Sequence, residues 1–430
     1  MKLSFENLGA IKKIDLDLSK KLIIFCGPNG TGKTYACYAI YGYLKFLLPG
    51  WDLFDLDELL QKKTVDVALD YTRLYKFRKG YFDYLKKHIK DVFGTNSAHY
   101  FNAFNSSDLS SEDQYAASLR QDEFEFTYNY NGVSITYTKE KESDKLCIKV
   151  DESIPLDKIT DLTRVYHIAT ITKYLCNKSL LYSYILPVER NSAYTFADEL
   201  AANRLKDAIP ETKEQNYPSP IKDLLSIAVE LKSIKNMQSN PAFQLLAAEI
   251  EENILQGKVI VSDEGALEFI SKKEPEVVLP VHLSASIVKN ISGLLIYLKH
   301  QARKNELLII DEPEIGLHPD NQILLARIFA RLINSGLRLL ISTHSDYIIR
   351  ELNNLIMLSS DKDEVKKKAS EFHYLHDEPI QPGNVGAYLF DYNTQDGKNV
   401  VVQELPVNQN GFEVDTIDQA ISLQNLGVYL

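Results

Sequence analysis

The sequence predicts an α/β fold with a mostly parallel sheet, an antiparallel β lobe and helical insertions. Between residues 307 and 358, apolar strand patterns alternate with helical patterns, and this order requires crossover helices and a parallel sheet. Residues 124–137 alternate strictly around Asn131-Gly132, which indicates an antiparallel hairpin with a type I′ turn. Residues 51–95 and 194–256 have helical spacing, so we expect them to be insertions in the α/β core.

Composition restricts the class of protein. The chain has 430 residues, of which 45% are hydrophobic and 25% charged, an ordinary balance for one large or two to three smaller globular domains. Its longest apolar runs, such as Leu307–Ile310, are too short to cross a bilayer, and the first residues lack the apolar core of a signal peptide. The cysteines are scattered, without paired or metal-ligand spacing: Cys26, Cys37, Cys147 and Cys176. We expect a reduced, cytoplasmic protein with no membrane segment and no structural zinc.

The net charge of −11 opposes DNA binding by bulk electrostatics, because neutralising phosphates requires a positive surface. Any nucleic-acid contact is expected to come from a local basic patch or from a partner. Residues 71–88 interleave aromatic rings with basic side chains, namely Arg73, Lys76, Arg78, Lys79, Lys86 and Lys87. This stretch has two interpretations: a nucleic-acid surface with stacking rings, or an amphipathic helix pair with a solvated lysine face and the rings in the core. We favour the second.

The chain begins with a predicted hairpin of edge strands at residues 2–8 and 14–18 and then enters its most informative stretch. An apolar strand, residues 23–26, leads into a loop of the form G-x-x-x-x-G-K-[ST], and a helical pattern follows at residues 35–48. Glycines let successive main-chain N–H groups surround the α- and β-phosphates of a nucleotide, and the following helix points its positive end at the anion. The expected nucleotide-binding residues of this loop are Gly27, Pro28, Asn29, Gly30, Thr31, Gly32, Lys33 and Thr34.

Two side chains of this loop have separate expected roles. Lys33 reaches the β- and γ-phosphates, and the Thr34 hydroxyl occupies one coordination site of Mg²⁺. A glycine-rich turn with a chance lysine is the alternative interpretation of the motif. The position of the loop between a strand and a helix favours phosphate binding.

The middle of the chain predicts a polar loop, then the β lobe, then further helices. Residues 96–122 have the composition of a loop, and residues 146–150 add a third strand to the hairpin. The elements that follow are expected to be a helix at residues 159–175, a buried strand at 181–188, an amphipathic helix at 243–255 and a hairpin at 258–261 and 267–270.

The C-terminal part predicts a second series of strands and helices. A helix opens at Leu283-Ser284, with Ser284 or Ser286 as its N-cap. The later elements are expected to be a strand at 307–310, helix 319–334, strand 337–342, helix 346–352, strand 355–358, strands at 387–392 and 400–406, and a short helix near 415–421.

Acidic and histidine side chains follow two of these strands, at the carboxyl end where parallel sheets place their ligands. Asp311 is expected to support Mg²⁺ on the Thr34 side of its shell, and Glu312 to polarise a water for in-line attack on the γ-phosphate. His344 is expected to contact that phosphate or to hold the water. Each has an ordinary alternative, since an acidic pair often caps a loop and an isolated Thr-His-Ser often has no role. Their shared position at strand ends favours a single site.

These segments resemble a known family. Gly27–Thr34, Leu307–Glu312 and His344 are similar to the Walker A, Walker B and H-loop segments of ABC-type ATPases. More narrowly, the chain resembles the SMC/RecF-like branch and the ATPase part of the overcoming-lysogenisation-defect (OLD) family, including bacterial ATPases of the AAA_15 and AAA_21 type that accompany nucleases or toxins in phage-defence loci. The stretches that carry this likeness are Asp311–Pro319, Ser342–Leu355 and Leu186–Ser192.

The resemblance implies a head-to-head homodimer in which each ATP lies between the P-loop of one subunit and the signature segment of the other. Leu283–Ile287 is expected to be that segment, with Ser284 and Ser286 as its nucleotide-binding residues, although Ala285 and Ser286 stand where the family form has glycine after the serine. Gly316-Leu317-His318 occupies the place of the D-loop, with His318 where an aspartate is common. Glu189-Arg190 either lines the site or forms an ordinary surface ion pair.

The resemblance also implies a domain order and a function. The expected boundaries are residues 1–50 (N-terminal lobe of the ATPase head), 51–122 (helical insertion), 123–190 (antiparallel β lobe and connecting helix), 191–257 (helical insertion) and 258–430 (C-terminal lobe of the head). The chain lacks a TOPRIM-like acidic cluster, so a nuclease or toxin effector is expected on a separate polypeptide. We expect a regulatory ATPase, with a RecF-like ATPase that clamps DNA directly as the alternative, and we consider a transporter subunit the least fitting class.

Overall fold

The computed structural model describes residues 1–46, 62–95, 101–155, 160–177, 180–194, 217–393 and 399–414. Its central element is a nine-stranded mixed sheet in the order β5-β1-β2-β16-β15-β3-β14-β13-β9. The strands are β1 (Lys2–Leu8), β2 (Ile11–Asp17), β3 (Leu22–Cys26), β5 (Asn105–Asp108), β9 (Ser183–Leu186), β13 (Leu307–Asp311), β14 (Arg338–Thr343), β15 (Val385–Tyr392) and β16 (Val400–Leu405). Neighbouring strands from β15 to β9 are all parallel, whereas the β5–β1, β1–β2 and β15–β16 pairs are antiparallel. The predicted α/β class with a mostly parallel sheet is confirmed.

The central strands are continuous apolar runs because helices cover both of their faces. Every residue of β3 and β13 is buried, and so are five of the six residues of β14. In this part of the sheet, Cys26 is paired with Thr343, and Asp311 is paired with Ser342. The loops that follow β3, β14 and β13 therefore leave the sheet side by side at its carboxyl edge.

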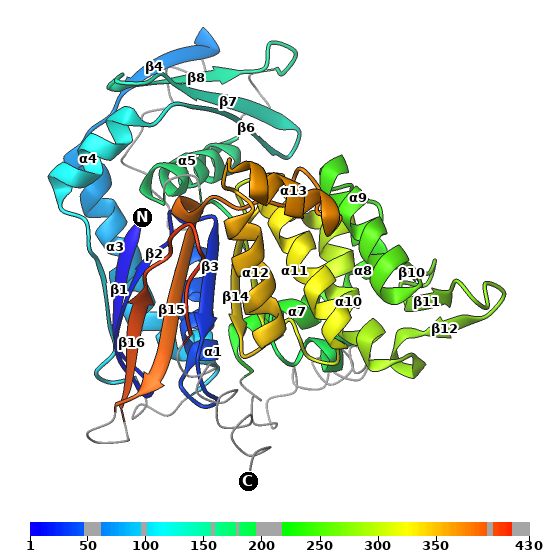
Figure 1. Cartoon of the computed structure of the whole chain (residues 1–430). Coiled ribbons are helices and arrows are strands. Elements are labelled where there is room, and N and C mark those ends of the chain that lie inside the picture. Colours follow the sequence, from blue (N-terminus) through cyan, green and yellow to red (C-terminus); the bar gives the residue numbers. More distant parts are fainter. Residues whose placement is uncertain are drawn as a thin grey trace.

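Helices form a layer on each face of this sheet (Figure 1). Ile23 and Ile24, neighbours on β3, belong to different apolar clusters, one shared with α1 and α3 and the other with α9 to α12. The helices are α1 (Lys33–Lys45), α3 (Tyr71–Phe93), α4 (Glu112–Gln121), α5 (Asp161–Cys176), α7 (Ser219–Val229), α8 (Leu231–Ile234), α9 (Pro241–Ile250), α10 (Ser286–Ile296), α11 (Pro319–Asn334), α12 (Asp346–Met357) and α13 (Asp363–Glu371). Within the described ranges, no helix is long and apolar enough to cross a membrane.

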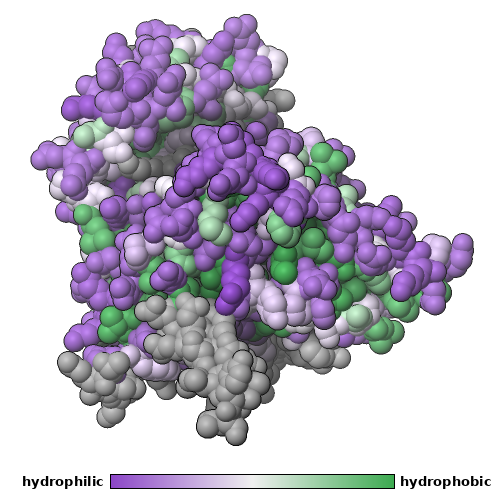
Figure 2. Space-filling model, viewed as in Figure 1, coloured by the Kyte–Doolittle hydropathy of each residue, from purple (hydrophilic) through white to green (hydrophobic). Residues whose placement is uncertain are grey.

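A separate four-stranded antiparallel sheet forms the β lobe, which lies over α5 at the top of Figure 1. Its strands, in spatial order, are β4 (Thr64–Ala68), β8 (Lys145–Val150), β7 (Val133–Lys139) and β6 (Phe124–Tyr130). The predicted hairpin is confirmed: Asn131 and Gly132 both have positive φ, as a type I′ turn requires, and Tyr130 is paired with Val133. The outer surface of the lobe is largely hydrophilic (Figure 2). A small third sheet contains β10 (Gly257–Val261), β11 (Leu267–Ser271) and β12 (Val278–Pro280).

Several predicted elements were wrong. Residues 96–122 are not a loop in their described part, because β5 pairs with β1 and α4 begins with a capping box between Ser111 and Gln114. Since β5 is the outermost strand, the N-terminal hairpin is not at the edge of the sheet. The stretch 51–122 is therefore not purely helical: it contributes β4 to the lobe and β5 to the head.

Two further corrections concern the C-terminal part. The strand predicted at 355–358 is instead the end of α12 and its C-cap Leu358, because a short apolar run has no periodicity that separates strand from helix. The N-cap of α10 is Ala285, which has no side chain for capping, and not Ser284 or Ser286. The helix predicted near 415–421 lies outside the described residues.

The basic and aromatic stretch 71–88 belongs to one long helix, α3, and not to a helix pair. The rings of Tyr71, Tyr75, Tyr81 and Phe82 are buried, and so is Arg78, which pairs with Asp108 of β5. The other basic residues of the stretch are exposed. The interpretation as a helix with its rings in the core is confirmed.

Candidate nucleotide-binding site

A cleft of about 580 Å³ opens at the carboxyl edge of the central strands. It is lined by Gly9, Ala10, Asn29, Gly30, Gly32, Lys33, Thr34, Tyr35, Glu312 and His344. The structure thus brings together residues from the three predicted segments, which are more than 300 positions apart at their extremes. A ligand cleft at this edge is what open α/β sheets provide, and its size suits a nucleotide.

Three lining residues had no predicted role. Gly9 and Ala10 form the turn between β1 and β2, and the Tyr35 ring lies against Gly9, where an added Cβ would be 2.6 Å from the ring. Tyr35 directly follows Thr34, but no motif in the sequence indicates that its side chain faces the cleft.

The P-loop has the conformation that its glycines predict. Gly27 has a φ of 127°, and a Cβ at this position would lie 2.0 Å from the carbonyl oxygen of Phe390, so only glycine fits. Gly32 (φ 88°) is the N-cap of α1, which starts at Lys33 and directs its free N–H groups toward the cleft. Thr31 is fully buried and its hydroxyl donates to the Pro28 carbonyl at 2.8 Å. Gly27, Pro28 and Thr31 therefore shape the loop, whereas Asn29, Gly30 and Gly32 line the cleft.

Lys33 lies with its ammonium group inside the loop. Nζ donates to the carbonyl oxygens of Gly27 (2.9 Å) and Pro28 (2.7 Å). Burial lowers the pKa of this lysine, and the nearby carboxylates of Glu312 and Asp311 oppose that shift. A phosphate group that replaced the two carbonyl partners would add a charge-assisted hydrogen bond.

Asp311 is almost fully buried at the end of β13, with 1% of its surface exposed. The Ser342 hydroxyl donates to Oδ1, while Oδ2 makes no close hydrogen bond with any described residue. Burial raises the pKa of this carboxyl group; the Ser342 hydroxyl and, more weakly, the Thr34 hydroxyl lower it, and Glu312 raises it. A buried carboxylate oxygen without a donor, beside a threonine hydroxyl, fits Mg²⁺, which is held by one or two protein oxygens together with phosphates and waters. Within the described residues, no group of three or more His, Cys, Asp or Glu side chains is placed to hold a metal ion without such help.

Glu312 and His344 form a direct contact at the cleft. His344 Nε2 lies 2.8 Å from Glu312 Oε1, and His344 Nδ1 lies 3.3 Å from the Gly27 carbonyl oxygen. Glu312 has a φ of +50°, a left-handed conformation that costs a non-glycine residue about 1–3 kcal/mol. Both side chains are partly accessible, with 28% of Glu312 and 31% of His344 exposed. The pair can therefore reach a bound water while it contacts the P-loop.

Two further residues hold this pair: Glu314, which had no predicted role, and Arg190, for which the sequence left two interpretations open. Glu314 Oε1 accepts hydrogen bonds from the His344 main-chain N–H (2.7 Å) and the Thr343 hydroxyl (2.9 Å). Arg190 is only 2% exposed and donates to the main chain of Asp311 and Glu312. The interpretation of Glu189-Arg190 as a surface ion pair is therefore wrong for Arg190. The third acid in Asp311-Glu-Pro-Glu314 was the sequence signal for Glu314. No signal in the sequence indicated that Arg190 is buried behind Glu312.

The structure does not bring the predicted signature residues into the cleft of their own chain. Ser284 donates from Oγ to the Val281 carbonyl (2.6 Å), and Ser286 is exposed at the first position of α10. In the predicted D-loop, Gly316 has a φ of 70°, and His318 caps α11 by accepting from the Asp320 N–H.

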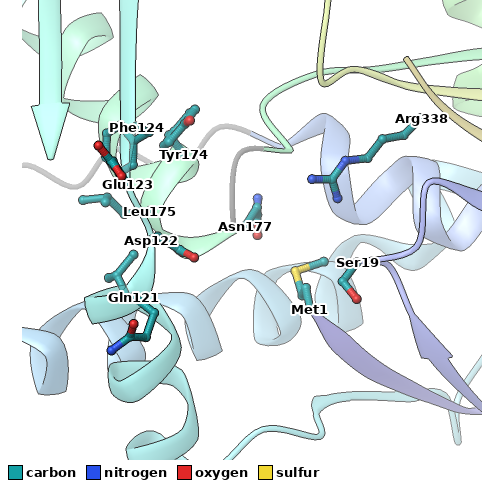
Figure 3. Close-up of a pocket in the computed structure, with 11 residues that line it drawn as sticks. Met1, Ser19, Gln121, Asp122, Glu123, Phe124, Tyr174, Leu175, Asn177 and Arg338 are labelled. Atoms are coloured by element: carbon teal, nitrogen blue, oxygen red, sulfur yellow. The ribbon is translucent and has the colours of Figure 1, made fainter. Parts of the chain in front are cut away.

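A second cavity, of about 380 Å³, lies where the β lobe meets the head. Phe124 and Glu123 are on one side of it and Arg338 is on the other (Figure 3). Arg338 is the first residue of β14, so this cavity is at the opposite end of that strand from His344. None of the predicted site residues lines it.

Comparison with solved structures finds similarity to SMC heads. The chain is similar to an SMC head bound to the C-winged helix domain of ScpA (13% identity, 94% of this chain and 97% of that chain, TM-score 0.36). It is also similar to the SMC head domain from Thermotoga maritima (9%, 94% and 98%, TM-score 0.32). A third similar structure is an SMC head with an extended coiled coil, bound to the C-terminal domain of ScpA derived from Pyrococcus furiosus (12%, 99% and 98%, TM-score 0.34).

Comparison of sequences gives a family. No curated protein matches the chain significantly. The model of the AAA_15 family, described as an AAA ATPase domain, matches residues 1–349. This match spans the P-loop, the acidic pair and His344, and the chain belongs to the AAA_15 family of AAA ATPase domains.

Proposed function

We propose that this protein binds Mg²⁺ and ATP in the P-loop cleft and hydrolyses the β–γ phosphoanhydride bond. The observation that carries the proposal is the 2.8 Å contact between Glu312 and His344 at the mouth of the cleft that Lys33 and Thr34 line. An acid, an imidazole, a lysine and a helix N-terminus at one point are the groups that phosphoryl transfer to water requires.

Each group has a role that its position supports. The P-loop N–H groups and Lys33 bind the phosphates, and Thr34 and Asp311 hold Mg²⁺, which when bound neutralises charge on the triphosphate. Glu312 accepts a proton from a water as the water oxygen bonds to the γ-phosphorus, and ADP leaves with the electron pair of the broken bond. His344 holds the Glu312 carboxylate and lies next to the P-loop, where it also orients the water or the γ-phosphate.

We further propose that ATP joins two copies of the chain. Ser284 and Ser286 lie at the N-terminus of α10, outside the cleft of their own subunit, where they are accessible to a second copy. The adjacent Leu283 is 68% exposed, a large apolar side chain that an interface would cover. In this arrangement the α10 N-terminus of one subunit faces the γ-phosphate bound by the other.

The cellular role that we propose is regulation of a separate effector, a nuclease or toxin, in bacterial anti-phage defence in the cytoplasm. This part rests on the resemblance of residues 342–355 and 186–192 to ATPases that accompany such effectors. ATP-driven joining and hydrolysis-driven separation of the subunits would then switch the effector.

One observation favours a different role, in which the protein clamps DNA directly. The exposed basic residues of α3, including Arg73, Lys76 and Lys87, form a row that phosphates could contact. The net charge of −11 opposes this. Binding of the isolated protein to duplex DNA as a function of salt separates the two: tight binding with a steep salt slope would establish the clamp and reject regulation without DNA contact.

The catalytic proposal is tested with Lys33→Ala and Glu312→Gln. We expect Lys33→Ala to weaken ATP binding about ten- to hundredfold, since a hydrogen bond to a charged group contributes about 1.5–3 kcal/mol. Glu312→Gln is expected to keep ATP binding and to lower kcat about 10²–10⁴-fold, the usual contribution of a general base. ATP binding is measured with a fluorescent ATP analogue and turnover as released phosphate. Hydrolysis by Glu312→Gln at the parent rate would reject Glu312 as the base.

A further inference from the structure

Arg190 is a buried cation whose hydrogen bonds to the described residues all end on main-chain carbonyl groups. Its Nη1 donates to Asp311 (2.7 Å) and Pro187 (3.1 Å), its Nη2 to Glu312 (2.7 Å) and its Nε to Asn290 (3.2 Å). Burial lowers the pKa of this arginine to about 10, and the Asp311 carboxylate is the strongest opposing influence. Burying a guanidinium group against neutral carbonyls costs desolvation energy. What it gains here is a planar fork of donors that can contact several carbonyls at once.

The four carbonyl groups belong to three separate segments. Pro187 follows β9, Asn290 lies on α10, and Asp311 and Glu312 are the last residue of β13 and the residue after it. A planar group with fixed donor directions can hold such a set in one arrangement, which a flexible ammonium group cannot do.

The Glu312 carbonyl is the partner that matters for the chemistry. On the other side of the same residue, the Glu312 N–H is held by the Ser342 carbonyl (3.1 Å) and hydroxyl (3.2 Å). The main chain of Glu312 is therefore clamped on both sides, by Ser342 and by Arg190, in its left-handed conformation. Release of the carbonyl would let φ and ψ relax and would turn the carboxylate away from His344.

The Asn290 contact connects the same guanidinium to the second turn of α10. Asn290 is 3% exposed, and its side chain donates to the Ile315 carbonyl (3.0 Å) in the loop that follows Glu312. An added Cβ on Gly316, the next residue, would lie 2.6 Å from Asn290 Nδ2, so helix and loop are in close contact. A displacement of α10 would therefore reach the main chain of Glu312 through Arg190 and Asn290.

We propose that Arg190 is a positioning residue: it holds the Glu312 main chain in the orientation needed for hydrolysis and makes that orientation depend on the position of α10. This inference rests on the proposed function, in which Glu312 is the general base and the N-terminus of α10 meets the partner's nucleotide. Arg190 is not among the residues that line the cleft, so we expect its effect to be on turnover and not on ATP affinity.

The test compares Arg190→Gln with Arg338→Gln. Arg338 is a matched control, since it also donates to a main-chain carbonyl (Leu18, 3.1 Å) and burial also lowers its pKa, but it lies at the far end of β14. We expect Arg190→Gln to lower kcat about hundredfold, the cost of misplacing a catalytic group by about 1 Å, while the Kd of a fluorescent ATP analogue changes less than about threefold. Arg338→Gln is expected to leave both values near those of the parent. Arg190→Lys is expected to restore part of kcat, because an ammonium group reaches fewer of the carbonyls.

A double-mutant cycle with Glu312→Gln separates positioning from general stability. If Arg190 acts through Glu312, adding Arg190→Gln to Glu312→Gln lowers the residual rate no further. The inference is overturned if Arg190→Gln has the kcat of the parent, or if the losses in the double variant are additive. It is also overturned if both Arg190 variants lose ATP binding and have a lowered melting temperature. The proposed function fails separately, when the parent does not hydrolyse ATP or when Glu312→Gln is as active as the parent.

Discussion

At the scale of single residues, the candidate site depends on side chains held in costly states. Glu312 has positive φ, Asp311 is a nearly buried carboxylate, and Lys33 is a buried ammonium group. Each state is unfavourable alone and is stabilised by hydrogen bonds from neighbours. Ser342 contacts the Glu312 main chain and the Asp311 carboxylate, and the P-loop carbonyl groups accept from Lys33. Strain and burial of this kind gather at functional sites because the surrounding fold supplies the stabilisation.

The role of Asp311 in metal binding is tested by Asp311→Asn, which keeps the shape of the side chain and removes its charge. We expect the Mg²⁺ concentration that gives half-maximal ATP hydrolysis to rise about 10–100-fold, since a carboxylate that supports the ion is replaced by a neutral amide. Asp320→Asn, at an exposed position in the first turn of α11, is the control and should not change the Mg²⁺ requirement. An unchanged requirement in Asp311→Asn would remove Asp311 from the metal site.

At the scale of elements, packing between helices brings one further buried charge next to the P-loop helix. Lys173 of α5 donates to the Leu44 carbonyl in the last turn of α1. The final carbonyl groups of a helix lack partners within the helix and favour a cation. Burial lowers the pKa of this lysine from 10.5 to about 7. The contact links α5, against which the β lobe packs, to α1, the helix that starts at the P-loop.

This shift predicts a pH dependence of stability. Between pH 7 and about 10.5 the unfolded chain binds the Lys173 proton and the folded chain does not, so the free energy of unfolding rises with pH by up to about 1.4 kcal/mol per unit from this group. Below pH 7 the unfavourable buried charge is fully present. Lys173→Met should therefore flatten the pH dependence between 7 and 10 in urea unfolding, relative to the parent. The exposed Lys87→Met serves as control, and identical slopes in Lys173→Met and the parent would contradict the shift.

At the scale of the whole molecule, one chain has a complete P-loop side of the site, while Ser284 and Ser286 lie elsewhere on its surface. A symmetric pair would complete two sites at once, because each surface would meet the other in both directions. The β lobe lies at the top of the head in Figure 1, at the opposite end of β14 from the cleft.

Complementation between two inactive variants tests this arrangement. Lys33→Ala disables the P-loop, and Ser286→Arg places a bulky charge at an exposed position on the other proposed surface. Each variant alone should be inactive, whereas an equal mixture should recover about a quarter of the parent rate, because half of the pairs contain one site with both surfaces intact. The measurement is phosphate release with particle mass followed in parallel. Full activity of Ser286→Arg alone, or no recovery in the mixture, would contradict a shared site.

Motifs with local causes were predictable from the sequence. The P-loop could be predicted because the backbone of this loop requires positive φ, which glycine adopts readily, so the glycines mark it in the sequence. The 131–132 turn could be predicted because Asn-Gly favours the type I′ conformation. The strands β3, β13 and β14 were found because buried parallel strands are continuous apolar runs. Knowing these strands was enough to bring Lys33, Asp311, Glu312 and His344 to one edge.

What the amino-acid sequence determined by itself was thus the class of fold, the phosphate-binding loop and the acidic and histidine residues that meet it. Only the tertiary structure decided that β5 joins the head, that α12 continues to Met357, and that Arg190 is buried behind Glu312. It also placed Gly9 and Tyr35 in the cleft and Glu314 on the His344 main chain. The physical reason is the range of the interactions: turns and apolar runs follow from neighbours along the chain, whereas strand partners, burial and contacts to the main chain depend on residues more than 25 positions away.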